Sequence, residues 1–153
     1  MDRGIVADNA AGLDRLRTVV NGLGREDLVV PMPAGWTVAA VLGHLAFWDL
    51  RATELVRRTT AQGLSPSPLD ADLANEAMRH LLLAVPPGEA ARLALAAAEE
   101  AAATVAASSK EVLEALATLG EDFWPRRCRH WHKHLDDIQR ALETAGRPGN
   151  TAL

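Results

Sequence analysis

The sequence predicts an all-α fold, and two observations carry that prediction. The chain is rich in Ala and Leu, contains no Tyr and has only two Phe, while its β-branched residues are scattered rather than bunched. Apolar residues also recur at steps of three and four, as on one face of a helix. At 153 residues the chain has the length of one domain, which buries ~70% of its unfolded surface. We expect a single helical domain over residues 1–146 and a C-terminal tail over 147–153.

The first half of the chain predicts two long helices. The first is expected from about Ile5 to Asn21, because Gly22 and Gly24 interrupt the apolar pattern after it. The second begins near Thr37 and continues to about Gln62, before Gly63. The connection between them, GREDLVVPMPAGW, is longer than is usual in helical bundles, which favours a functional role for it.

The second half predicts a long crossover and two more helices. Residues 64–86 contain a Pro/Ser loop and a short helix that Pro86 and Pro87 must stop. The third long helix opens at Pro87 and is so rich in alanine that its neighbours are expected to approach closely.

An S-x-x-E capping box at Ser108–Glu111 predicts a break and restart of this helix before Gly120. The last helix is expected to start at Pro125 and to end at Gly146 and Pro148.

Charge and cysteine content exclude several classes of protein. The formal net charge is −4 and the arginines are spread along the chain, so a nucleic-acid partner is not expected. A lone cysteine, Cys128, excludes an internal disulfide. The sequence shows neither a signal-type apolar core at its N-terminus nor ~18 apolar residues in a row, so we expect a soluble, cytoplasmic protein without a membrane partner.

The most distinctive segment is RRCRHWHKHLDDIQRAL, residues 126–142. On a helix, His130 and His134 lie about 40° apart, whereas His132 points away from both. The pair flanks the apolar stripe of this helix, and two imidazoles one turn apart can bind a divalent transition metal together. The alternative is that they are satisfied side chains at a helix interface.

A third ligand is expected from His44, which lies at the edge of the apolar stripe of the second helix. Three neutral imidazoles leave coordination positions open for water or substrate, as catalytic sites require. Nickel, zinc, iron, manganese and cobalt all suit such a site. His80 and His132 are expected at the surface.

These residues form a pattern that resembles a known family. PMPAGWTVAAVLGHLAFWD, then an Asn-containing segment with Asn75, then HxxxHLDDI, are similar in order and spacing to the DinB/YfiT-like superfamily of metalloenzymes. That superfamily includes thiol-dependent transferases and mycothiol-dependent maleylpyruvate isomerases. The resemblance spans the whole chain. It implies a four-helix bundle of up-down-down-up topology, a metal held by His44, His130 and His134, and a homodimer; the long crossover agrees with this topology.

The resemblance also implies a function, namely transfer of a low-molecular-weight thiol such as bacillithiol or mycothiol to an electrophilic small molecule. Zinc or nickel is the first expectation for the metal. The alternatives are a metal-dependent hydrolase and a non-catalytic metal-binding or dimerising helical domain. Some thiol-dependent members have Glu at the position of His130, which counts against the isomerase interpretation.

Asp137 completes the predicted site, and four other side chains near it are expected to have other roles. Asp137 lies about 20° from His130 and is the expected catalytic residue, either orienting a ligand or acting as a base; the alternative is an exposed acid. Trp36 and Trp48 are expected to be core anchors rather than walls of a pocket. Arg127, with Arg126 before it, is expected to be solvated rather than to bind a carboxylate.

Overall fold

The computed structural model describes residues 3–119 and 125–147, and within these ranges the chain is helical apart from one short hairpin. The long helices are α1 (Arg3–Gly22), α3 (Val38–Gln62), α5 (Pro87–Ala107) and α7 (Arg127–Thr144). The short ones are α2 (Arg25–Leu28), α4 (Ala71–Leu82) and α6 (Lys110–Ala117). The hairpin pairs β1 (Pro31–Met32) with β2 (Trp36–Thr37) around a 3₁₀ turn at Pro33–Gly35. The prediction of an all-α fold is confirmed.

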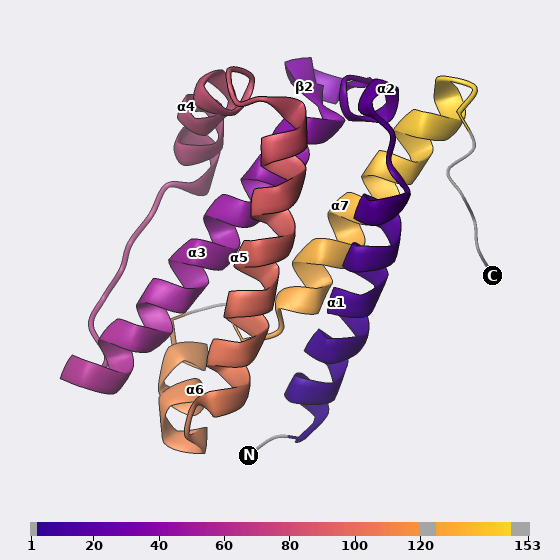
Figure 1. Cartoon of the computed structure of the whole chain (residues 1–153). Coiled ribbons are helices and arrows are strands. Elements are labelled where there is room, and N and C mark those ends of the chain that lie inside the picture. Colours follow the sequence, from indigo (N-terminus) through magenta and orange to yellow (C-terminus); the bar gives the residue numbers. More distant parts are fainter. Residues whose placement is uncertain (1–2, 120–124, 148–153) are drawn as a thin grey trace.

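The long helices lie side by side along one core. Figure 1 shows α1 and α7 running toward the upper end, and α3 and α5 running away from it. The segment after α3 returns along the molecule and carries α4 at the upper end, beside the hairpin. Within the described ranges, no helix combines the length and the apolar character needed to cross a membrane.

The core is built from apolar side chains of all four long helices. Leu16, Leu42, Leu135 and Ile138 are fully buried in it. The face of α5 toward the core is made of alanines, namely Ala90, Ala94, Ala97, Ala98 and Ala101. Such small side chains let α5 pack tightly along α3, as the alanine content predicted.

The contact between α1 and α7 is close and specific. A Cβ atom added to Gly12 would lie 2.6 Å from Cys128 Cβ, which real atoms do not tolerate. Asn9 is buried beside this contact; its Nδ2 donates to Pro125 O at 2.7 Å and its Oδ1 accepts from Cys128 N at 3.1 Å. α1 thereby fixes where α7 begins, which positions the histidines of the predicted cluster.

The predicted capping box is wrong by one residue. The N-cap of α6 is Ser109, whose hydroxyl accepts from Val112 N at 3.3 Å. Ser108 instead donates to Thr104 O at 2.7 Å, because its hydroxyl satisfies a carbonyl at the end of α5. The predicted helix end at Gly120 lies outside the described residues.

The predicted C-terminal tail is described only at its first residue. Arg147 forms ion pairs with Glu26 and Asp27, beyond the positive φ of Gly146 that ends the helix. Residues 148–153, including the predicted stop at Pro148, lie outside the described part.

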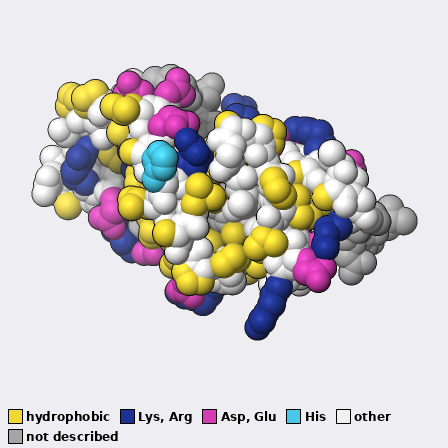
Figure 2. All heavy atoms as spheres, turned by 90° about the horizontal axis from the view of Figure 1, so that it is seen from above, with side chains coloured by type: hydrophobic (Ala, Val, Ile, Leu, Met, Phe, Trp, Pro, Cys, Tyr) yellow, Lys and Arg dark blue, Asp and Glu magenta, His cyan; other side chains and the backbone are white. Residues whose placement is uncertain are grey.

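The upper end of the molecule is partly apolar at its surface. Figure 2, a view onto this end, shows hydrophobic side chains gathered across its middle and charged side chains mostly toward the rim. This end carries α2, the hairpin and α4 (Figure 1).

Candidate metal centre

Three of the five histidines meet between α3 and α7. His44 lies in the second turn of α3, and His130 and His134 lie in successive turns of α7. The ring centroids are 4.7 Å apart for His130 and His134, 4.8 Å for His44 and His134, and 5.1 Å for His44 and His130. One ring nitrogen of each lies within 4.8 Å of the other two. The structure therefore brings together the three residues that the sequence suggested as ligands.

The other two histidines lie elsewhere. His80 is exposed on α4. His132 lies on the opposite face of α7, where its Nδ1 is 3.0 Å from the Arg15 guanidinium. The same guanidinium donates to Asp136 at 2.6 Å and to Gln139 at 3.0 Å. His132 is therefore part of a polar network between α1 and α7.

Burial keeps the three clustered histidines neutral. It lowers the pKa of His44 to about 3, with a further contribution from the charges of His134, Lys133 and Arg127. Burial, followed by the charge of Lys133, lowers the pKa of His134 to about 4. The pKa of His130 is also lowered, by burial and then by the charge of Arg127. Neutral imidazoles keep the nitrogen lone pair that metal coordination requires.

A buried network of charges supports His130. The Arg127 Nη2 donates to His130 Nδ1 at 2.9 Å, and the Arg127 Nε donates to Asp49 Oδ1 at 2.6 Å. Trp131 Nε1 donates to the other carboxylate oxygen of Asp49 at 2.8 Å. The side chains of Arg127 and Asp49 are only 2% and 0% exposed, so this is an ion pair removed from water. It fixes the orientation of the His130 ring.

This network was not predicted from the sequence. The expectation that Arg127 is solvated is wrong, because its guanidinium reaches inward to Asp49 of α3. Asp49 lies on a different face of its helix from His44, so helical geometry alone gave no signal for it. The one available signal was an acid next to the aromatic Trp48 in an otherwise apolar stretch.

The nitrogens facing one another in the cluster fit a cation. Because a guanidinium only donates, His130 Nδ1 accepts, and the proton of the neutral ring is on Nε2. That Nε2 lies 3.1 Å from His44 Nε2, so His44 accepts there and its own proton is on Nδ1. His44 Nδ1 is buried and has no hydrogen-bond partner. His44 is therefore not a satisfied core histidine. A metal ion between the rings would displace the Nε2 proton of His130, and the Arg127 guanidinium at Nδ1 would stabilise the negative charge that this leaves on the ring.

Asp137 lies beside His134 rather than beside His130. Its Oδ2 is 3.7 Å from His134 Nδ1, and its other carboxylate oxygen accepts from Arg140 one turn further along α7. The Asp137 side chain is 33% exposed, so it faces both the cluster and the solvent. A carboxylate beside a metal-binding histidine is the common means of orienting that ring.

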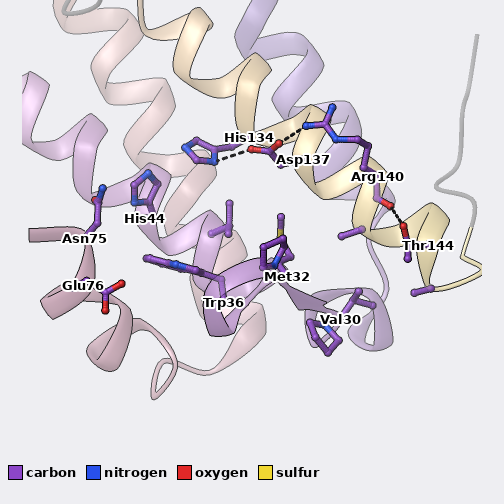
Figure 3. A pocket seen from close by; sticks show the side chains of 15 residues that line it. Val30, Met32, Trp36, His44, Asn75, Glu76, His134, Asp137, Arg140 and Thr144 are labelled. Atoms are coloured by element: carbon purple, nitrogen blue, oxygen red, sulfur yellow. Dashed lines mark hydrogen bonds and ion pairs between the residues drawn. The ribbon is translucent and has the colours of Figure 1, made fainter. Parts of the chain in front are cut away.

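Two cavities adjoin the histidine cluster. The first, which we call the apolar cavity, has a volume of about 680 Å³ and lies between α3, α7 and the hairpin. Figure 3 shows His44 and His134 at this cavity, with Trp36 and Met32 from the hairpin and the His134–Asp137–Arg140 contacts along α7. The residues that define it are Val30, Met32, Trp36, Val41, Asp137 and Ala141, together with His44, Asn75 and His134.

The second, which we call the basic cavity, has a volume of about 760 Å³ and lies on the α4 side of the cluster. The residues that define it are Trp48, Arg51, Ser67, Arg127, His130 and Lys133, together with the same His44, Asn75 and His134. The two cavities thus share a wall that contains two of the three clustered histidines.

Two tryptophans form cavity walls. Trp36 also packs against the hydrophobic core, as expected, whereas Trp48 is not among the side chains that pack against it. Trp36 is half-buried and lines the apolar cavity, with its ring centroid 5.6 Å from that of His44. Trp48 is half-buried in the basic cavity, and its Nε1 donates to Asn75 Oδ1 at 3.1 Å. Trp48 lies on α3 and Trp36 on β2, just before α3, and at both positions packing and cavity-lining side chains look alike in sequence.

Comparison with known proteins identifies the family. The model of the DinB superfamily matches residues 10–147, nearly the full length of the chain and including all three clustered histidines. No curated protein matches the chain. No solved structure matches it either. The resemblance noted from the sequence is confirmed, and the chain belongs to the DinB superfamily.

Proposed function

We propose that the chain is a metal-dependent enzyme that transfers a low-molecular-weight thiol, such as bacillithiol or mycothiol, to an electrophilic small molecule. His44, His130 and His134 would hold a divalent transition metal, with zinc or nickel the first expectation and iron, manganese or cobalt the alternatives. One observation carries the proposal: three buried, neutral imidazoles converge at the wall shared by two cavities.

A divalent metal supplies Lewis acidity, which lowers the pKa of a bound thiol or water and yields a nucleophile near neutral pH. The surrounding residues supply the rest. Trp36 and its apolar neighbours exclude water from one side of the cluster. Asp137 lies 3.7 Å from the Nδ1 of His134, a residue of the wall shared by both cavities, and would accept the thiol proton there. The sulfur then forms a bond to the electrophilic carbon, and the leaving group departs with the electron pair of the bond that breaks.

The two-cavity arrangement supports a reaction between two substrates. Each cavity has room for a small molecule, and each opens onto His44 and His134. A hydrolase needs room for only one organic substrate and a water molecule. The thiol transferase therefore accounts for more of the observed space than the hydrolase does.

Metal analysis and a thiol-consumption assay test the proposal. We expect the purified chain to bind about one divalent ion, measured by inductively coupled plasma mass spectrometry, and to accelerate thiol addition to monochlorobimane. His44→Ala should abolish both. His132→Ala is the matched control, because His132 is on the same helix as two of the ligands but contacts Arg15 instead; it should retain both.

Three outcomes would contradict the proposal. If the protein binds no metal after zinc or nickel is added, the proposed reaction lacks the ion on which it depends. Metal with ester hydrolysis but no use of thiol would favour the hydrolase, and metal without turnover of either kind would favour a non-catalytic metal-binding domain. The expected homodimer is a separate prediction, tested by light scattering coupled to size-exclusion chromatography.

A further inference from the structure

The charges around the two cavities differ in sign. The described side chains that line the basic cavity include three cations, Arg51, Arg127 and Lys133, and no carboxylate. The apolar cavity is lined by the carboxylates of Glu76 and Asp137 and by one cation, Arg140, which is paired with Asp137. Arg127 is paired with the buried Asp49, and Glu76 is paired with Arg79. The charges that distinguish the two cavities are therefore those of Arg51 and Lys133, which favour an anion in the basic cavity over the apolar one.

Lys133 is the cation most clearly available to a ligand. It is exposed, lies between His130 and His134 in the sequence, and forms no ion pair or hydrogen bond with any described residue. Of the two other exposed cations of α7, Arg140 pairs with Asp137, and Arg129 lines neither cavity. The positive charge of Lys133 contributes to the lowered pKa values of all three clustered histidines, so the ammonium group is electrostatically close to them.

Arg51 shapes the other side of the basic cavity. Its guanidinium donates to the carbonyl oxygen of Ser67 at 3.2 Å and to the Ser67 hydroxyl at 3.1 Å. It also lies over the Trp48 ring, 5.6 Å from the ring centroid. These contacts fix a positive group and an aromatic wall in the cavity that Lys133 also lines.

The access to the histidines also differs between the cavities. All three clustered histidines line the basic cavity, whereas only His44 and His134 line the apolar one. Approach of an anionic nucleophile to the histidine cluster is therefore more favourable through the basic cavity. The positive charges of that cavity also stabilise a thiolate.

We propose that the thiol substrate is an anionic molecule that bears a carboxylate and occupies the basic cavity, with its carboxylate at Lys133 and Arg51. The electrophile is an uncharged, largely apolar molecule and occupies the apolar cavity. This inference rests on the proposed thiol transfer and adds to it the charge class and the cavity of each substrate. The two reacting atoms meet at the shared wall of His44 and His134.

The test uses two thiols of similar size that differ in charge. Mercaptosuccinate carries two carboxylates, and thioglycerol carries two hydroxyls. Both are titrated calorimetrically into the full-length, metal-free protein, so that sulfur–metal bonds do not contribute to the affinity. We expect mercaptosuccinate to bind about tenfold more tightly than thioglycerol, with an affinity that falls as salt is added.

Variants of the two lysines of the chain then locate the carboxylate. Lys133→Gln should weaken mercaptosuccinate binding by about fivefold, and Lys133→Arg should retain it, because the charge is kept. Lys110→Gln is the matched control, since Lys110 lies on α6, outside both cavities, and pairs with Glu114; it should leave the affinity unchanged.

Equal affinity of the two thiols, or mercaptosuccinate binding that does not respond to Lys133→Gln, would overturn the inference. Failure of the proposed function looks different. Carboxylate binding that depends on Lys133, in a protein that binds metal but consumes no thiol, would support the anion site and contradict the thiol transfer.

Discussion

The two faces of α7 place the same kind of side chain in opposite environments. On the outer face, His132 meets Arg15, which also binds Asp136 and Gln139, so every group has a polar partner near solvent. On the inner face, His130 and His134 are withdrawn from water, and the neighbouring His44 keeps a nitrogen without a partner. Histidine spacing alone therefore does not distinguish the inner face of α7 from the outer one; burial and the unsatisfied ring nitrogen of the neighbouring His44 do.

The largest expected difference between the faces is in stability. Asp49→Asn removes the anionic partner of Arg127 and leaves a buried charge uncompensated, which costs about 3–5 kcal/mol in the free energy of unfolding. Asp136→Asn removes an exposed partner of Arg15 and costs less than about 1 kcal/mol. Urea unfolding followed by circular dichroism measures both. Equal losses in the two variants would show that the inner ion pair is no more important than the outer one.

The second difference concerns ligand binding. A metal that binds only the folded state stabilises it by about 2.7 kcal/mol at a free concentration of 100 times the Kd. Zinc or nickel should therefore raise the melting temperature of the wild type and of His132→Ala, but not that of His130→Ala. A thermal shift that survives in His130→Ala would place the ion outside the cluster.

A third difference is in the response to acid. In the metal-free protein the pKa values of His44 and His134 are lowered to about 3 and about 4, below the ordinary value of 6.5. Below pH 6.5 the unfolded state then binds more protons than the folded state, so stability falls with decreasing pH until the folded pKa is reached. Each histidine contributes a slope of up to about 1.4 kcal/mol per pH unit between pH 6 and pH 4.

His44→Gln should flatten this slope, as measured by urea unfolding at several pH values. The prediction would be refuted by a His44→Gln variant whose acid sensitivity equals that of the wild type.

The smallest effect is expected from the outer network itself. Arg15→Gln breaks contacts that are mostly exposed, and we expect a loss of less than about 1 kcal/mol with unchanged metal affinity. Calorimetric titration with zinc provides the measurement. A marked loss of zinc affinity would mean that the contacts of α1 with the outer face of α7 help to position the histidines on its inner face.

Sequence patterns predicted more of the histidine cluster than of its surroundings. The spacing of His130 and His134 places both on one helix face, and the apolar stripe of the second helix pointed to His44. The Asp49–Arg127 pair could not be found in this way, because it depends on which residue of a second helix a long guanidinium reaches. The cavity-lining positions of Trp36 and Trp48 were not predicted for a related reason: a half-buried position looks the same in sequence whether it faces the core or a cavity.

The long helices of the fold were predictable from the sequence, but its smaller elements were less so. Helix-forming composition and glycine and proline positions predicted the long helices nearly to the residue. The hairpin was missed because each of its strands has only two residues, too few for any alternation to show.

The close approach of Gly12 to Cys128 has a practical consequence. Cys128 is the single thiol of the chain and is 6% exposed under α1. A fluorescent maleimide should therefore label it only when α1 separates from α7, which makes the labelling rate a built-in reporter of local opening. For the same reason the folded protein does not consume an added electrophile through its own sulfur, so background alkylation stays low in assays of thiol chemistry.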